Sequence, residues 1–287
     1  MSDKNESKSG SGLLARLMRN RPTKPGEIYG VPGGGESLAI SAVTGLLLIG
    51  LWIACTSLGW VKPLFLPSPF TVGAKALKIA HEGFANNTLW EHIWISALRV
   101  FGALALACVT AIPIGLAMGM NRIMRGVFDP PIEFYRPVPP LAYLPLMIIW
   151  FGIGELSKVL LIFLAIFAPV AIGTRSGVKS AAIEQIHAAY SLGANRWQVL
   201  SQVILPAAAP EIITSIRIGM GVGWTTLVAA EMVAATKGVG FMVLTASQFL
   251  QTDVVIFGII IIAAIAYAFD MGMRWIEHKL VPWTGKM

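Results

Sequence analysis

Charged residues are scarce in this sequence: Asp, Glu, Lys and Arg make up 13% of its 287 residues, about half the usual share in a soluble domain. Hydrophobic residues make up 55%, and the mean hydropathy is +0.70. This composition excludes an ordinary soluble domain, because such a domain needs far more charge on its water-facing surface. It indicates a protein embedded in a lipid bilayer.

Residues and motifs for catalysis and cofactor binding are also missing. The two cysteines, Cys55 and Cys108, fall within apolar runs and predict neither a disulfide framework nor a metal site. The chain has no G-x-x-x-x-G-K-S/T loop to hold phosphates, and no apolar run carries a nucleophile–base pair, a cluster of metal ligands or a ring of charges. We therefore expect no catalytic residue, no metal and no cofactor on this chain, which argues against a membrane enzyme or a stand-alone channel.

Long apolar runs are what the sequence does contain. A helix needs roughly 20 residues to cross the hydrocarbon core, and five runs reach that length once flanking residues are included: 38–56, 93–118, 159–174, 218–230 and 254–269. A sixth, at 132–151, is interrupted by four prolines, which break helices. Such breaks survive in a membrane only against protein or a water-filled cavity. The sequence thus predicts an all-α polytopic membrane protein with six transmembrane helices, the third of which lines an internal surface.

The basic residues predict the orientation of these spans. With a cytoplasmic N-terminus, the inside segments carry 14 Lys and Arg residues and the outside segments carry five. This bias follows the positive-inside rule and places both termini in the cytoplasm. The net charge of +7 is therefore assigned to topology and not to nucleic-acid binding.

The spans divide the chain into five predicted segments. They are a flexible cytoplasmic tail at 1–36, a first transmembrane helix at 37–60, a periplasmic loop with a short interfacial helix at 61–91, a five-helix core at 92–276 that includes a polar loop at 181–206, and a cytoplasmic tail at 277–287. Ser68 followed by Pro69 is typical of a helix start, so we expect the interfacial helix to begin there.

The polar loop at 181–206 is unusual because it has helical patterning between two apolar spans. Ile183, Ile186 and Tyr190 recur at the spacing of one helix face. Gly193 follows, as a glycine that ends a helix does. The pattern predicts a short amphipathic helix that ends at a tight turn.

A second short helix is predicted after this turn. Asn195 and Gln198 have the spacing of a capping box, and Pro206 and Pro210 are expected to end the helix before the fifth span. A second apolar stripe lies at Trp197, Leu200 and Ile204. We expect both stripes to face the helix bundle and the turn between the helices to point outward.

The order of residues in this loop resembles the cytoplasmic loop of binding-protein-dependent ABC permeases. That motif has two alanines, a glycine four residues after the second alanine, and a hydrophobic-x-Leu-Pro ending. The matching positions are Ala188, Ala189, Gly193, Val203, Leu205 and Pro206. The family usually has Glu before the alanines, where this chain has His187. The stretches "LFLPSP", "EFYRPVPPLAYLPLMIIWFGIGELSK" and "RIGMGVGWTTLVAAEMVAATKGVGFMV" are similar to the sulfonate/nitrate/taurine branch of that family.

The resemblance implies a type I ABC importer permease fold with cytoplasmic coupling helices, in the bacterial inner membrane. It implies a second copy of the chain, two ABC ATPase subunits that bind ATP, and a periplasmic substrate-binding protein, with taurine or a related sulfonate as substrate. Nitrate, bicarbonate or another small anion stays open as an alternative. The residues that the resemblance assigns to ATPase coupling are His187, Ala188, Ala189, Gly193, Ala194, Leu205 and Pro206. We expect Gly219 and Gly223 to offer a small-residue face to the second copy.

Ionisable residues within spans are costly and usually face a cavity or a partner. Glu133 and Arg136, three residues apart, either pair with each other or leave Arg136 to attract a sulfonate. Glu231 either pairs with a basic group such as Arg99, or shapes the gate, or meets the ammonium group of taurine. We expect the translocation path to be lined by Arg136, Trp224, Thr225, Thr226 and Glu231.

Overall fold

The computed structural model describes residues 38–281, and the chain divides into two compact units, residues 1–69 and 70–287. The predicted tail at 1–36 lies outside the described residues. In the first unit, α2 (Leu38–Ser57) is the predicted first transmembrane helix. The Trp52 indole in this helix donates a hydrogen bond of 3.1 Å to the Pro67 carbonyl oxygen.

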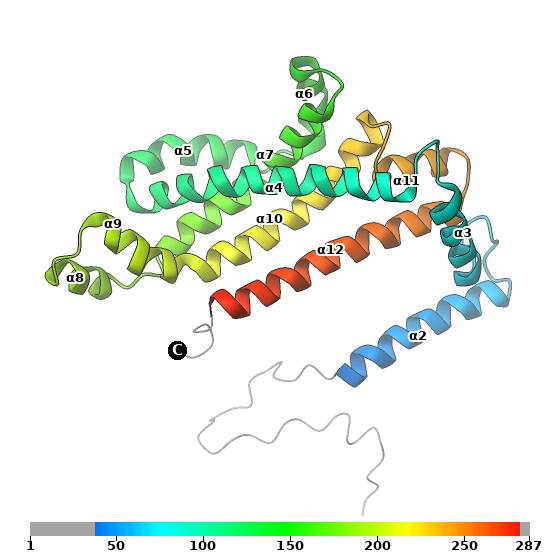
Figure 1. Cartoon of the computed structure of the whole chain (residues 1–287), viewed down its shortest axis with the longest axis horizontal. Coiled ribbons are helices and arrows are strands. Elements are labelled where there is room, and N and C mark those ends of the chain that lie inside the picture. The colour runs from blue at the N-terminus through cyan, green and yellow to red at the C-terminus, as the bar shows by residue number, and fades with distance from the viewer. Residues whose placement is uncertain (1–37, 282–287) are drawn as a thin grey trace, which may run out of the picture. The chain divides into compact units, whose positions relative to one another are not determined.

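The second unit is built from helices alone within the described residues (Figure 1). In chain order they are α3 (Pro69–Glu82), α4 (Leu89–Met120), α5 (Arg122–Tyr135), the 3₁₀-helix η1 (Pro140–Tyr143), α6 (Leu144–Phe151), α7 (Glu155–Val178), α8 (Ile183–Ser191), α9 (Arg196–Val199), the π-helical turn η2 (Leu200–Ile204), α10 (Leu205–Ala234), α11 (Val239–Gln248) and α12 (Thr252–Leu280). The prediction of an all-α protein is confirmed. The interfacial helix begins at Pro69 as predicted, and α12 continues to Leu280, through the start of the segment predicted as a C-terminal tail.

Four helical stretches among the described residues are long and apolar enough to cross a membrane: Leu89–Met120, Glu155–Val178, Arg196–Ala234 and Thr252–Leu280. Three shorter apolar stretches accompany them, at Ala42–Ser57, Pro140–Phe151 and Val239–Gln248.

The segment predicted as the third span, 132–151, is not one helix. α5 ends at Tyr135 and η1 begins at Pro140. Pro137, Pro139 and Pro140 lack the N–H that a helix needs, and each also disfavours helical geometry in the residue before it. α6 has only 8 residues, too few to cross a bilayer. This part of the chain is therefore a broken element, and a count of six full-length spans stays a prediction.

Close packing of α4, α7 and α10 forms the core of the second unit. Gly219 and Gly223 take part in it: a Cβ on Gly219 would lie 3.2 Å from Ile166 Cγ2, and one on Gly223 would lie 2.8 Å from Ile166 Cδ1. Their small size lets α10 approach α7 closely. The expectation that these two glycines face a second copy is wrong, because α7 of the same chain already covers them.

The long helices give the second unit two distinct ends (Figure 1). One end carries α8 and α9, whose core joins Val199 and Ile204 to Val178 at the end of α7. The other end carries α3 and α11, where Ile79 packs against Met242 and Val254. The candidate functional residues gather at these two ends.

Candidate functional site

The turn between α8 and α9 depends on one left-handed glycine. Gly193 has φ +85°, a conformation that residues with a Cβ rarely adopt. The Gly193 N–H donates to the Tyr190 carbonyl at 2.9 Å, and the Ala194 N–H donates to the Ala189 carbonyl at 3.0 Å. These two bonds make a Schellman motif, which ends α8 and reverses the chain. The predicted helix-ending role of Gly193 is confirmed.

The second helix begins at the predicted capping box. The Gln198 N–H donates to Asn195 Oδ1 and the Asn195 N–H donates to Gln198 Oε1, both at 2.8 Å. Each side chain satisfies a backbone N–H that the helix itself leaves unpaired. The turn Leu192–Asn195 is thus held by caps on both sides.

The helix does not end at Pro206 or Pro210, contrary to the prediction. α9, η2 and α10 continue as one helical stretch from Arg196 to Ala234. Leu205 N–H bonds to Leu200 O, five residues back, in the π-helical turn. This widened turn accommodates Pro206, which cannot donate to a carbonyl four residues earlier.

The predicted direction of the two apolar stripes is only half right. Ile186, Leu200 and Ile204 pack inward. Ile183, Tyr190 and Trp197 are exposed instead, Trp197 by 73%. The reason is that the main neighbours of α8 are α9 and η2, so only the side of α8 that faces them is covered.

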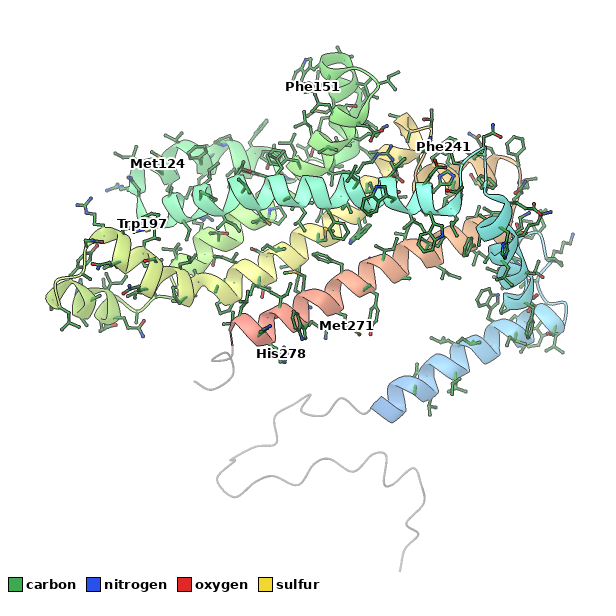
Figure 2. All side chains as sticks on the ribbon, viewed as in Figure 1. Met124, Phe151, Trp197, Phe241, Met271 and His278 are labelled. Carbon is green, nitrogen blue, oxygen red and sulfur yellow. The ribbon has the colours of Figure 1, made fainter. Side chains whose placement is uncertain are left out.

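The α8–α9 hairpin therefore presents an apolar outer surface. Leu192, next to the turn, is 88% exposed, and Trp197 projects at the same end of the unit as Met124 (Figure 2). Of the predicted coupling residues, the structure leaves four exposed and three half-buried. The exposed ones are His187, Ala188, Gly193 and Leu205, and the half-buried ones are Ala189, Ala194 and Pro206.

A cluster of ion pairs occupies the other end of the unit, and Arg99 of α4 is its centre. Arg99 is 3% exposed and binds Glu155 of α7 in a bidentate manner, with Nε–Oε2 and Nη2–Oε1 distances of 2.6 and 2.7 Å. Its Nη1 donates to Glu231 Oε1 of α10 at 2.7 Å and to the Lys237 carbonyl at 2.8 Å. One side chain thus joins three spanning helices and the loop after α10. We call this set of residues the Arg99 cluster.

Glu231 is fully buried, and its other contacts are also satisfied within the chain. Ser96 Oγ donates to it at 2.7 Å, and the Gly240 N–H donates to it at 2.8 Å. The interpretation of Glu231 as a partner of Arg99 is therefore confirmed. Gly238 permits this arrangement: its φ is +128°, and a Cβ there would lie 2.4 Å from Glu231 Cδ.

Sequence reasoning missed several members of this cluster. Lys158 Nζ donates to Glu155 Oε1 at 2.9 Å, and the Lys158 side chain is 5% exposed although the Glu155 side chain is 61% exposed. Glu155 and Lys158 have the three-residue spacing of a helix pair, a signal that the sequence carries. Ser96 carries no such signal, because its partner lies 135 residues away.

The remaining residues predicted for the path differ in exposure: some are buried and others face outward. Trp224 is buried against Phe101 with ring centroids 6.3 Å apart, and its indole nitrogen has no hydrogen-bond partner. Thr225 is exposed and Thr226 is buried, and both hydroxyls donate to the Val222 carbonyl, at 2.8 and 2.9 Å. Arg136 is exposed, and its Nη1 lies 3.9 Å from Glu133 Oε2, so the pairing that the spacing predicted is present. Among the described residues, no group of three or more His, Cys, Asp or Glu side chains is placed to hold a metal ion.

Comparison with known sequences gives consistent matches along this chain. Residues 111–282 match the family described as "Binding-protein-dependent transport system inner membrane component". The "Taurine transport system permease protein TauC" of Escherichia coli (strain K12) is 54% identical over 88% of this chain and 92% of its own length. The "Putative aliphatic sulfonates transport permease protein SsuC" of Bacillus subtilis (strain 168) is 37% identical over 83% of this chain and 84% of its own. The "Bicarbonate transport system permease protein CmpB" of Synechococcus elongatus is 27% identical over 86% and 90%.

Comparison with solved structures agrees on the fold. A chain from an inward-facing structure of the MetNI methionine ABC transporter superposes with a TM-score of 0.59 at 16% identity. The match covers 67% of this chain and 95% of that one. The similarity shows a shared ABC importer permease fold.

Proposed function

The chain belongs to the binding-protein-dependent transport system inner membrane component family, and on this premise we propose that it passes taurine or a related sulfonate through an ATP-driven importer. As a member of that family it is an integral inner-membrane permease subunit and not itself an enzyme. The observation that carries the substrate proposal is the 54% identity to a taurine permease, twice the 27% identity to a bicarbonate permease. Nitrate, bicarbonate and other small anions are the alternative substrates.

Transport by the reconstituted complex tests the substrate. The permease, its ATPase subunits and its binding protein would be placed in vesicles, and uptake of labelled taurine would be compared with uptake of nitrate and bicarbonate. We expect ATP-dependent uptake of taurine alone among the three. Uptake of nitrate or bicarbonate without taurine would overturn the assignment.

We propose that the exposed surface of the α8–α9 hairpin docks on an ABC ATPase subunit, which binds the ATP. The support is physical: Leu192, Trp197 and Ile183 expose apolar surface on a polar loop, and exposed apolar patches mark interaction sites. This end of the unit then faces the cytoplasm, as do both termini.

Two substitutions at Gly193 test this docking. Asp and Asn have the same shape and both tolerate a left-handed backbone, so Gly193→Asp and Gly193→Asn differ mainly in charge. We expect Gly193→Asp to abolish transport and ATPase copurification while the protein still inserts in the membrane, and Gly193→Asn to retain more of both. Full transport by Gly193→Asp would refute the docking site.

We propose that the working unit holds two copies of this chain and two ATPase subunits, together with a periplasmic binding protein. The support lies around α6, where residues 136–139 and 152–154 have irregular backbone. Irregular backbone at membrane depth needs cover from protein or water. Ile149 and Ile153 are exposed there, so a second copy is the partner that we propose for this surface. Mass measurement of the complex in detergent would contradict the proposal if it gave one permease per two ATPases.

The translocation path that we propose runs past Trp224, Thr225 and Arg136. The Trp224 indole N–H is buried and has no hydrogen-bond partner within the described residues, so in this proposal it meets a sulfonate oxygen when the helices around it move apart during transport. Thr226 and Glu231 would act from behind this surface, because both are buried. Trp224→Phe keeps an aromatic ring and removes the donor, so we expect taurine uptake to fall several-fold with assembly unchanged. Unaltered uptake would exclude Trp224 from the path.

A further inference from the structure

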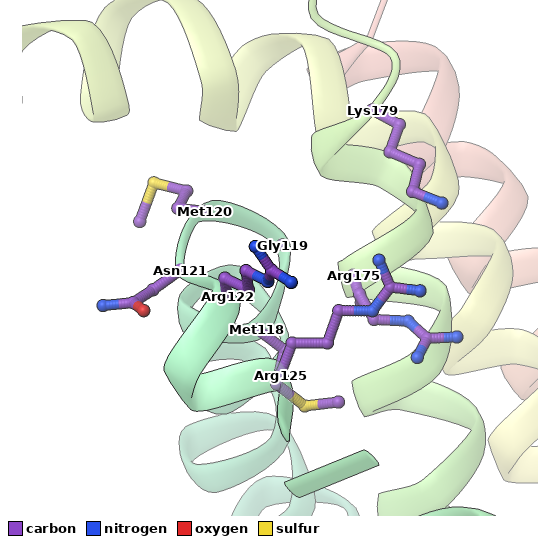
Figure 3. Close-up of a pocket in the computed structure, with 8 residues that line it drawn as sticks. All are labelled: Met118, Gly119, Met120, Asn121, Arg122, Arg125, Arg175 and Lys179. Carbon is purple, nitrogen blue, oxygen red and sulfur yellow. The ribbon is translucent and has the colours of Figure 1, made fainter. Parts of the chain in front are cut away.

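A pocket lined by basic side chains lies where α4, α5 and α7 meet (Figure 3). Its cationic lining residues are Arg122, Arg125, Arg175 and Lys179. The spanning helices α4 and α7 both end here, at Met120 and Val178. The pocket therefore lies at the level where the hydrocarbon of a membrane gives way to water.

The carboxylates nearby neutralise only part of this charge. Asp129 pairs with both Arg125, at 3.1 Å, and Arg175. Glu133 lies 3.9 Å from Arg175. Neither Arg122 nor Lys179 has a carboxylate within 4.0 Å among the residues that the structure describes.

The start of α5 adds positive potential to the same pocket. Arg122 is its first residue, and Asn121 caps it by accepting a hydrogen bond of 2.8 Å from the Ile123 N–H. The first turn of a helix favours anions, because its N–H groups and its dipole are positive there. The pocket thus combines two unpaired cations with a helix start, an arrangement suited to a phosphate group.

Apolar surface also borders the pocket, and it favours a phosphate-bearing ligand that has an apolar part. Met120 lines it and is 47% exposed. A free phosphate would make no use of this surface, whereas acyl chains would cover it. Basic pockets between membrane helices are known to hold anionic lipid headgroups.

We propose that this pocket binds the phosphate headgroup of an anionic phospholipid, with the acyl chains along the exposed side chain of Met120. Arg122 and Lys179 provide the charge that is free to meet the phosphate. Arg125 and Arg175, tied to Asp129, hold the wall of the pocket. The pocket lies at the same end of the unit as the α8–α9 hairpin, but neither the turn residues 192–195 nor the residues proposed for the substrate path line it.

Lipid binding to the purified full-length permease would test the proposal. Phosphatidylglycerol, phosphatidylethanolamine and inorganic phosphate would each be titrated, with bound lipid counted by native mass spectrometry and thermal stability recorded in parallel. The variant is Arg122→Gln/Lys179→Gln. The control is Lys62→Gln/Lys78→Gln, which removes the same charge from exposed residues that do not line the pocket.

We expect phosphatidylglycerol to bind and stabilise the wild type and the control, and phosphatidylethanolamine to do neither. The pocket variant should bind phosphatidylglycerol about thirtyfold more weakly, since each cation near a lipid phosphate contributes about fivefold. Equal binding by variant and control would overturn the proposal. So would stabilisation by inorganic phosphate as strong as that by the lipid, which would identify a soluble anion as the ligand.

Loss of ATPase copurification by the pocket variant, with lipid binding intact, would also overturn the proposal and make the pocket a protein contact. These measurements do not involve transport. A failure of lipid binding alone would therefore leave the proposed substrate and the proposed coupling surface untouched.

Discussion

The α8–α9 hairpin and the Arg99 cluster lie at opposite ends of the same three-helix core. They differ in whether their side chains find partners within the chain. In the Arg99 cluster, Arg99 and Glu231 are buried and fully hydrogen-bonded within the chain. In the hairpin, Leu192 and Trp197 remain exposed although both are large and apolar. The first region is complete in one chain, and the second has the surface of an interface. Stability and partner binding are therefore expected to respond to substitutions at different ends.

The largest loss of stability is expected from Arg99→Met. It removes the cation that Glu231 and Glu155 share and leaves Glu231 buried without a counter-charge. Breaking a buried pair in this way costs about 3–5 kcal/mol, which should appear as a large drop in the unfolding temperature in detergent. Arg136→Met removes an exposed arginine whose ion pair spans 3.9 Å, so it should cost less than about 1 kcal/mol. Similar unfolding temperatures for the two variants would show that the buried ion pairs of the Arg99 cluster stabilise the fold no more than the exposed pair of Arg136 does.

A smaller but clear loss is expected from Gly238→Ala. The new Cβ would overlap the Glu231 carboxylate, 2.4 Å from Cδ, at a φ of +128°. Displacing that carboxylate and straining the backbone should together cost about 2–3 kcal/mol. The matched control is Gly221→Ala, since a Cβ at this helical glycine meets no atom within 4 Å. The control should unfold at the wild-type temperature or slightly above it, and an equal loss in both variants would contradict the explanation.

Two capping boxes allow the ends to be compared with one motif. Thr88 with Glu91 begins α4, and Asn195 with Gln198 begins α9. Replacing either cap by alanine should cost about 1 kcal/mol. We expect Thr88→Ala to lower the global unfolding temperature, because α4 belongs to the core. Asn195→Ala should instead speed hydrogen exchange in residues 183–199, which open locally. A reversed pattern would mean that the hairpin, and not the cluster, unfolds with the core.

The smallest effect is expected at Lys158. Its partner Glu155 is 61% exposed at the side chain and keeps both bonds to Arg99. Lys158→Met therefore leaves no buried charge unpaired and should cost about 1 kcal/mol or less. If it lowered the unfolding temperature as much as Arg99→Met, the stability of the cluster would depend on Lys158 as much as on Arg99.

The two ends also differ in how far the sequence predicts them. The hairpin is local: the hydrogen bonds of the Gly193 turn and of the Asn195–Gln198 box span five residues or fewer, so spacing alone predicts them correctly. The cluster is not local, since Arg99 meets Glu155 56 residues away and Ser96 meets Glu231 135 residues away. Sequence reasoning named Arg99 and Glu231 as one possible pair and missed the glycine at 238 that lets the loop close over them.

Two errors have the same physical origin. Small residues at Gly219 and Gly223 predict close packing, but spacing does not tell which helix packs there, and α7 of the same chain does. Pro206 predicts a break, but a π-helical turn can supply the room that a proline needs. In both cases the sequence signal is correct locally, but tertiary structure decides which helix packs against the glycines and how the chain accommodates the proline.

The unbroken helix from Arg196 to Ala234 has a mechanical consequence. At about 1.5 Å per residue, the roughly 35 residues between the hairpin and Glu231 extend about 50 Å, so the helix is a lever arm with one end in each region. A tilt of about 10° at one end displaces the other by about 9 Å. Because the stretch is continuous, a displacement of the exposed turn can reach the buried ion pairs without crossing a loop, and the π-helical turn beside Pro206 is where the helix can bend.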